Sequence, residues 1–169
     1  METSPLRCVL DTNVVIDFDT GGCLDALFAL PLVLTVPDII IADEYLSVDA
    51  EHLKALGLQV DSLTGPQVMD IIALGLQHVR PSRYDLAAYV LARDLPAILL
   101  TGDGSLRTLA KTTGVDCHGT LWLLDHIVSG GIAPAPQMAA ALQRMLDGGS
   151  RLPKAACDQR LRRWQRISQ

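Results

Sequence analysis

The feature that most constrains the fold is an apolar run that ends abruptly in an acid, and it occurs twice. Residues 7–18 read RCVLDTNVVIDF, and residues 96–106 read PAILLTGDGSL. Each run predicts a buried strand that delivers a carboxylate to its carboxyl end, first Asp11 and then Asp103. In an open α/β sheet, ligands bind outside the carboxyl ends of the strands, so both acids are expected at one edge. The alternative is that Asp11 and Asn13 only cap the helix that follows.

The rest of the chain alternates strand patterns with helix patterns. The second of the two apolar runs is expected to form its strand at residues 97–100, and further strands are expected at residues 32–37, 58–63 and 115–119. The segments between them have helical periodicity. One helix is expected from Asp38 through Ala50, with Glu44 displaced from its apolar positions, and another after Ser82, a predicted N-cap, with Asp85 in its first turn. This alternation predicts an α/β fold in which a central parallel sheet of about five strands is covered by helices on both faces.

Length and composition exclude several classes of protein. A chain of 169 residues fits one domain with a core of its own. No apolar run approaches the roughly 20 residues that span a bilayer, and the N-terminal METSPLR lacks the order of a signal peptide. We therefore expect a cytoplasmic protein without a membrane segment. The cysteines are widely spaced and form no Cys-x-x-Cys pair, which argues against a zinc site or a disulfide framework.

Four acids stand out by their placement along this pattern. Asp11 and Asp103 follow strands, Asp85 begins a helix and Glu44 lies inside one. Each has another explanation, since acids are common as helix caps and as solvated helix residues. Brought together, however, four carboxylates without a partnering His or Cys repel one another unless cations lie among them. Oxygen ligands of this kind suit Mg²⁺ or Mn²⁺, so the sequence predicts a metal site.

Four stretches of the chain, taken in order, resemble the successive motifs of the PIN-domain nucleases. They are VLDTNVVID, ADEYL, SRYDLAAYVLA and LLTGDGSL, and the likeness covers about residues 6–128. The continuation through LWLLDHI and the tail GSRLPKAACDQRLRRW resembles the bacterial and archaeal branch related to VapC toxins. The resemblance implies a three-layer α/β/α PIN-like fold. Residues 1–132 are then the nuclease domain, and residues 133–169 are an extension of two helices packed on the same domain.

The resemblance also implies an activity and the residues that carry it. In the family, a catalytic metal site is formed by the acids that match Asp11, Glu44, Asp85 and Asp103, with support from the residues that match Asn13 and Thr101. The chain is then expected to be a Mg²⁺- or Mn²⁺-dependent endoribonuclease that hydrolyses RNA, as the toxin or a toxin-like member of a type II toxin–antitoxin system. Its expected partners are RNA, a cognate antitoxin protein and a second copy of the chain. One departure is Arg83-Tyr84, which is bulkier than the residues that usually precede the third acid.

Two other functions share part of this pattern. A haloacid-dehalogenase-like phosphatase also begins with a strand ending in Asp and carries a later GDG-like motif. Its chemistry requires a second Asp two residues after the nucleophile as general acid, and Asn13 occupies that position here. The non-enzyme alternative is a degenerate PIN fold that acts as a binding module, against which the presence of all four acids argues.

The C-terminal tail carries a charge opposite to that of the body. Residues 1–150 hold 18 acidic against 8 basic side chains, whereas residues 151–169 hold six basic against one acidic. The tail is expected to form a helix with Leu161, Trp164 and Ile167 on one apolar stripe. The arginines predicted to hold RNA phosphates, or to meet an acidic partner, are Arg162, Arg163 and Arg166. The alternative is a helix docked on the body with its charges in solvent.

Overall fold

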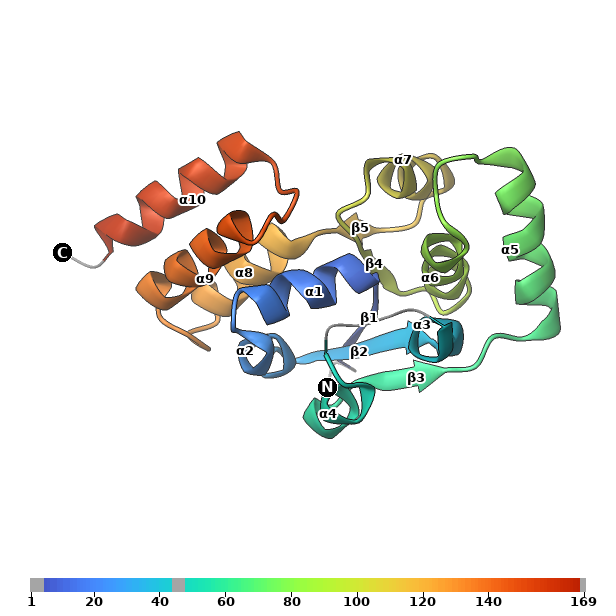
Figure 1. Ribbon diagram of the computed structural model, residues 1–169, viewed down its shortest axis with the longest axis horizontal. Coiled ribbons are helices and arrows are strands. Elements are labelled where there is room, and N and C mark those ends of the chain that lie inside the picture. Colours follow the sequence, from blue (N-terminus) through green and yellow to red (C-terminus); the bar gives the residue numbers. More distant parts are fainter. Residues whose placement is uncertain (1–4, 44–47, 168–169) are drawn as a thin grey trace.

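A parallel sheet lies at the centre of the molecule. The computed structural model describes residues 5–43 and 48–167, and within them five strands pair in the order β3-β2-β1-β4-β5 (Figure 1). The strands are β1 (Leu6–Leu10), β2 (Leu32–Pro37), β3 (Gln59–Asp61), β4 (Ile98–Leu100) and β5 (Cys117–His118). The chain runs outward from β1 to β3 and then returns to the other side of β1, where Leu10 pairs with Leu100. Such a reversal places ligand sites at the carboxyl ends of β1 and β4.

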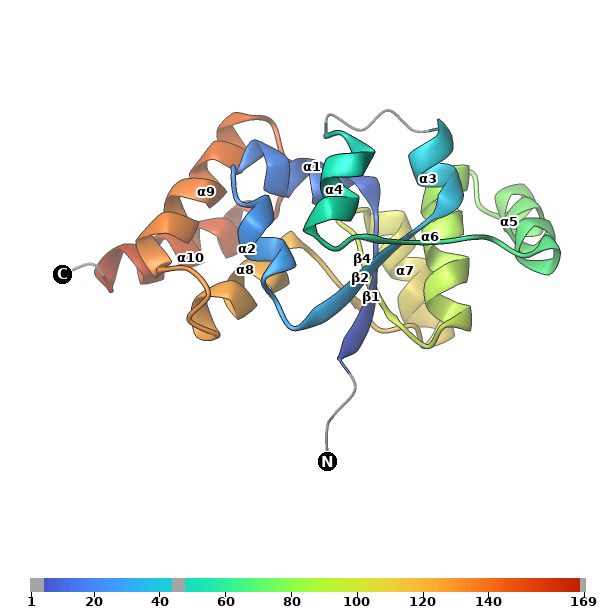
Figure 2. The same ribbon diagram turned by 90° about the horizontal axis from the view of Figure 1, so that it is seen from below.

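Helices cover both faces of this sheet, which confirms the predicted three-layer α/β/α architecture (Figure 2). One face is covered by α1 (Thr12–Thr20), α2 (Leu24–Phe28), α4 (Ala50–Leu56), α8 (Thr120–Ser129) and α9 (Ala135–Asp147). The other face is covered by α5 (Gly65–Gln77), α6 (Arg83–Asp94) and α7 (Gly104–Thr113). Two further helices are α3 (Asp38–Asp43), directly after β2, and α10 (Lys154–Arg166), which packs on α9. No helix in the described part of the chain is long and apolar enough to cross a membrane.

The central strand contributes to the core on both of its faces. Cys8 and Leu10 pack with the α1 and α9 side, whereas Val9, between them, packs with the α6 side. Successive residues of a strand point to opposite faces, so a strand covered on both sides is apolar throughout. This is why the run before Asp11 is continuous rather than alternating.

The local signals at helix starts are mostly confirmed, but one predicted helix is wrong. Ser82 caps α6 in a reciprocal pair with Asp85, as expected. The helix predicted from residue 38 through residue 50 is not continuous, because α3 is described over Asp38–Asp43 and a separate helix, α4, begins after Asp49. Asp49 has an extended backbone and is the N-cap of α4, so the periodic pattern belongs to two helices. Residues 44–47, with Glu44, lie outside the described residues.

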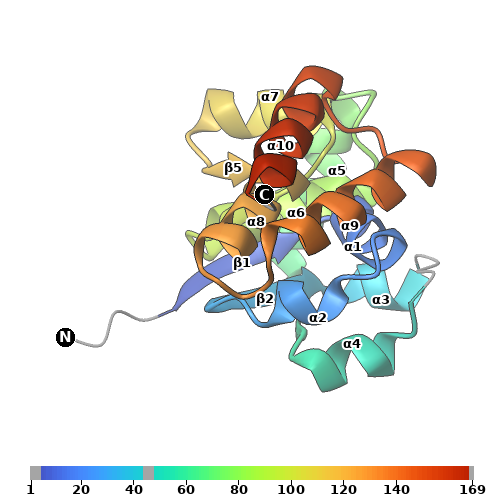
Figure 3. The ribbon, with the colours of Figure 1, turned by 90° about the vertical axis from the view of Figure 1, so that its left-hand side faces the viewer.

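The two C-terminal helices are held against α1 and α8 (Figure 3). Trp164 of α10 is fully buried and belongs to the same core as α8 and α9. The segment between the helices, residues 148–153, is hereafter the α9–α10 loop. A Cβ atom at Gly148 would lie 2.4 Å from Thr20 Cγ2, so a glycine there lets the loop approach the end of α1 closely. This contact brings the loop to the carboxyl edge of the sheet.

Candidate active site

A buried threonine joins the two acids that follow β1 and β4. The hydroxyl of Thr101 donates to Oδ2 of Asp11 (2.7 Å) and accepts from the backbone N–H of Asp103 (3.0 Å). The backbone N–H of Asp11 donates to the carbonyl of Leu100 (2.9 Å), which extends the pairing of the two strands by one residue. Asp11 is only 3% exposed and Thr101 is fully buried. Asp11, Thr101 and Asp103 are thus brought together at the point where the strand order reverses.

Asp103 is also the N-cap of α7. Its Oδ1 accepts from the backbone N–H of Leu106 (2.8 Å) and from the hydroxyl of Ser105 (2.5 Å). Partial burial by itself would raise the pKa of Asp103. The hydrogen bonds from Ser105 and Leu106 and the positive charge of Arg80 outweigh it, so the pKa of Asp103 lies below its ordinary value. Asp103 is therefore ionised at neutral pH. The hydrogen bonds from Ser105 and Leu106 both go to Oδ1, and neither uses Oδ2.

Asp85 lies at the start of α6 and is used in the cap of its own helix. Its Oδ2 accepts from the backbone N–H of Ser82 (2.7 Å), and its own N–H donates to the Ser82 hydroxyl (3.2 Å). Since α6 leads directly into β4, its N-terminus lies toward the carboxyl edge of the parallel sheet. Among the described residues, no hydrogen bond joins Asp85 to Asp11 or Asp103.

A pocket of about 400 Å³ opens beside Asp103. Its walls come from α1, from the residues after β4 and from the α9–α10 loop, and they include Asn13, Asp17, Gly102, Asp103, Gly149 and Arg151. Asn13 is exposed, whereas Asp17 is half-buried and accepts a hydrogen bond from the hydroxyl of Thr120 (2.7 Å). The pocket thus combines two carboxylates, an amide and a guanidinium at the carboxyl edge.

The comparison with known families agrees with this geometry. The family model described as DUF3368, a PIN domain, matches residues 7–166. The chain belongs to the PIN-domain family. PIN domains are generally metal-dependent nucleases, and the match extends over both C-terminal helices. No curated protein matches the chain significantly.

The oxygen donors of this PIN domain fit a hard divalent cation in their chemistry. Asp11, Asp103 and Asn13 offer carboxylate and amide oxygens, the ligands that Mg²⁺ and Mn²⁺ take. In addition, Asp38 follows β2, the other neighbour of β1, and its Oδ1 is buried with no donor among the described residues. Within residues 5–43 and 48–167, however, no three His, Cys, Asp or Glu side chains gather closely enough to hold an ion by themselves. Glu44, the fourth acid predicted from the sequence, lies outside these residues, and Asp85 is bound to Ser82.

Two acids of this PIN domain, one in the pocket and one directly after β2, were not predicted from the sequence although a signal for each was present. Asp17 lies four residues after Asn13 in α1, and positions i and i+4 share a helix face. Asp38 follows β2 in the way that Asp11 follows β1, but it was interpreted only as the start of a helix. Arg151 had no such signal, because it reaches the pocket through the packing of the α9–α10 loop.

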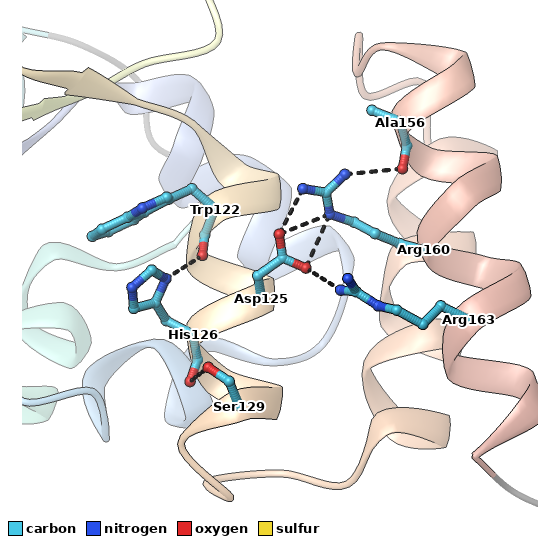
Figure 4. Close-up of polar contacts among 7 residues, drawn as sticks. All are labelled: Trp122, Asp125, His126, Ser129, Ala156, Arg160 and Arg163. Carbon is cyan, nitrogen blue, oxygen red and sulfur yellow. Dashed lines mark hydrogen bonds and ion pairs between the residues drawn. The ribbon is translucent and has the colours of Figure 1, made fainter.

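The tail arginines lie on α10, and one of them is already paired. Arg163 binds Asp125 of α8 (2.7 Å) beside Arg160, which binds the same carboxylate through both of its oxygens (Figure 4). Arg162 donates to the carbonyl of Asp158 within its own helix. Arg166, in the last turn of α10, is exposed. A role of Arg162, Arg163 and Arg166 in holding RNA stays a prediction.

Proposed function

We propose that this PIN domain is a Mg²⁺- or Mn²⁺-dependent endoribonuclease that hydrolyses phosphodiester bonds of RNA. The observation that carries the proposal is the link from Asp11 through Thr101 to Asp103, at the switch point of a parallel sheet and beside a pocket. The membership of the PIN-domain family supports a nuclease, and the oxygen-only donors support a hard divalent cation.

Each residue of the site has a role in this proposal. Asp11, Asp85, Asp103 and Glu44 would hold the cation, and Asn13 and Thr101 would support them. When bound, the cation neutralises the phosphodiester, makes the attacking water more acidic and stabilises the departing oxygen. Thr101 fixes the orientation of Asp11 by a hydrogen bond between two buried side chains. The cap of α7 does the same for Asp103, and Asn13 can donate its amide N–H to a phosphate oxygen in the pocket.

The alternatives fit the site less well. Aspartyl-phosphate chemistry needs an acid two residues after Asp11, and the side chain there, Asn13, can neither take nor give the proton. A binding module without activity does not require an ionised Asp103 beside a buried carboxylate.

Cleavage of a mixed RNA pool tests the proposal. Hydrolysis is expected with Mn²⁺ or Mg²⁺, and it is expected to stop in EDTA and in Asp11→Asn and Asp103→Asn. The amide keeps the shape of the carboxylate, and Asn is as good an N-cap as Asp, so α7 should stay intact. Asp25→Asn is the matched control, since this exposed acid of α2 lies outside the pocket. Full activity of both site variants would overturn the assignment, and mapping of the cut ends identifies the preferred sequence.

We further propose that the nuclease is the toxin, or a toxin-like member, of a type II toxin–antitoxin system, as the resemblance to the VapC-related branch suggests. An apolar surface supports a protein partner, either an antitoxin or a second copy. It includes Met69, Ile72 and Leu76 of α5 with Val79 after it, and Leu76 and Val79 are 85% and 96% exposed. Patches of this kind mark interaction sites in other proteins. Induced expression should arrest growth with the wild type and not with Asp103→Asn, and growth with both at equal protein levels would contradict the toxin role.

A further inference from the structure

A second cavity, of about 640 Å³, adjoins the pocket of the candidate active site. Gly102, Arg151 and Leu152 line both, so the two cavities are continuous along the α9–α10 loop. Their linings differ in charge. The first contains Asp17 and Asp103, whereas the described lining of the second contains no acid and includes Arg107, His118, Trp122, Arg151 and Arg160.

The guanidinium of Arg107 is held in a fixed position in the second cavity. Its Nε donates to the carbonyl of Thr101 (3.1 Å), the same residue whose hydroxyl links Asp11 to Asp103. A Cβ atom at Gly119 would lie 2.3 Å from Nη2 of Arg107, so the absence of a side chain there makes room for the guanidinium. This bond uses Nε and leaves the terminal N–H groups for an anion. A phosphate is well matched to a guanidinium oriented in this way.

The other two arginines of the cavity differ in their availability. Arg160 donates from Nε and Nη2 to Asp125 and from Nη1 to the carbonyl of Ala156, so each of its guanidinium nitrogens is already engaged (Figure 4). Arg151 is exposed on the loop at the junction of the two cavities, and no described residue pairs with it. Arg107 and Arg151 therefore supply the positive charge of the cavity.

An ordered aromatic wall completes the cavity. The indole of Trp122 stacks on the imidazole of His118, with ring centres 4.4 Å apart and planes 15° apart. His126 packs against the same indole at 4.0 Å, and its Nδ1 lies 2.8 Å from the carbonyl of Trp122 (Figure 4). These contacts hold His118 and Trp122 in place at the cavity. Flat, fixed rings of this kind are the surfaces on which proteins bind unpaired bases.

We propose that the second cavity is a nucleotide subsite for single-stranded RNA. Arg107 and Arg151 bind a phosphate, and the wall of His118 and Trp122 contacts the adjoining base. The inference rests on the proposed ribonuclease function and adds where its substrate binds. Because Arg151 lies at the junction of the two cavities, the bound nucleotide is next to the phosphodiester that faces Asp103. The base must be unpaired, since a paired base presents only its edges to a protein.

Binding of RNA without metal tests the subsite separately from catalysis. The probe is a fluorescein-labelled oligouridylate of about ten nucleotides, a length within the usual range of single-strand sites, measured by anisotropy in EDTA over a series of salt concentrations. Arg151→Gln should weaken binding and lower the salt slope by about 0.7, the value for one phosphate contact on a single strand. Trp122→Leu should weaken binding by roughly fivefold to a hundredfold, the range for one stacked base, with the slope unchanged. Trp122→Phe should restore most of the affinity.

Arg7→Gln is the matched control for charge. Arg7 lies in β1, toward the amino end of the strand and away from the carboxyl edge, so this variant loses the same charge without touching either cavity. The subsite would be overturned if Arg151→Gln bound the oligouridylate with the same affinity and the same salt slope as Arg7→Gln. If the wild type still cleaves RNA in that case, the ribonuclease function stands. A wild type that neither binds nor cleaves RNA would overturn both.

Competition by polyglutamate as strong as that by unlabelled oligouridylate would also overturn the subsite, because a peptide has no base. If Trp122→Leu is unfolded in thermal denaturation, Arg151→Gln, a change in an exposed loop, still decides the question.

Discussion

Replacing Thr101 by valine removes the hydroxyl that links the two acids while keeping the shape of the side chain. Two hydrogen bonds are lost, one to the carboxylate of Asp11 at 2.7 Å and one from the backbone N–H of Asp103 at 3.0 Å. A bond to a charged group contributes about 1.5–3 kcal/mol, and a neutral one contributes about 1 kcal/mol. Thr101 is fully buried, so water does not replace the lost partner. We therefore expect Thr101→Val to lower the free energy of unfolding by about 2–4 kcal/mol.

The matched variant is Thr101→Ser, which keeps the hydroxyl and loses one methyl group, a change of about 1 kcal/mol. Urea unfolding followed by circular dichroism measures both variants. In thermal unfolding, the loss expected for Thr101→Val corresponds to a fall in Tm of roughly 4–16 °C for a domain of this size. Nuclease activity should fall with Thr101→Val and persist with Thr101→Ser, because only the former releases Asp11 from its orientation.

A result that would refute this reasoning is equal stability of the two variants. The hydroxyl would then contribute nothing that a methyl group does not, and the link from Asp11 to Asp103 would not hold the site together. Equal stability with a selective loss of activity in Thr101→Val would refute the energetic argument alone.

Two further predictions follow from the charges of the molecule. The pKa of Asp103 lies below its ordinary value of 3.8 in the folded chain, so its ionised form stabilises the fold above that pH and the contribution is lost as the pH falls through the lower, folded value. The difference in unfolding free energy between wild type and Asp103→Asn should therefore shrink as the pH falls below about 3.8, and a difference that stays constant in urea unfolding over this range would contradict it. Asp125→Asn leaves Arg160 and Arg163 without their carboxylate and should cost about 1.5–3 kcal/mol in unfolding free energy. The control is Glu51→Gln, which breaks an exposed pair with Lys54 and should cost less than about 1 kcal/mol; similar losses in the two variants would argue against a stabilising role of Asp125.

The fold was predictable from the sequence because its central strands are read from unbroken apolar runs. The run before Asp11 is buried on both faces, and this environment leaves no room for polar residues. The continuous helix expected around Glu44 was wrong, because two short helices can share one periodic pattern. Only the backbone of Asp49 reveals the break.

The site was predictable in part, and the limit is physical. Strand ends in a parallel sheet meet at one edge, so Asp11 and Thr101 could be assigned to it. The packing of the helices decides which strands are neighbours. This packing places Leu100 beside Leu10. Arg107, Trp122 and Arg151 come from three elements that the sequence does not relate to one another. Of the three, Arg151 lies in the α9–α10 loop, whose Gly148 packs closely against Thr20 of α1.

The position of the α9–α10 loop also has a consequence for synthesis on the ribosome. Translation delivers Asp11 early, and β4, which pairs with β1, emerges only after most of the helices on the α6 side. The loop follows later still, and Arg160 of the next helix anchors that helix to Asp125. A nascent chain interrupted before this helix would contain the acids and the loop, but it would lack the helix that follows the shared wall of both cavities and whose Arg160 binds Asp125. The order of translation therefore assembles the carboxylates first and the enclosure for the substrate afterwards.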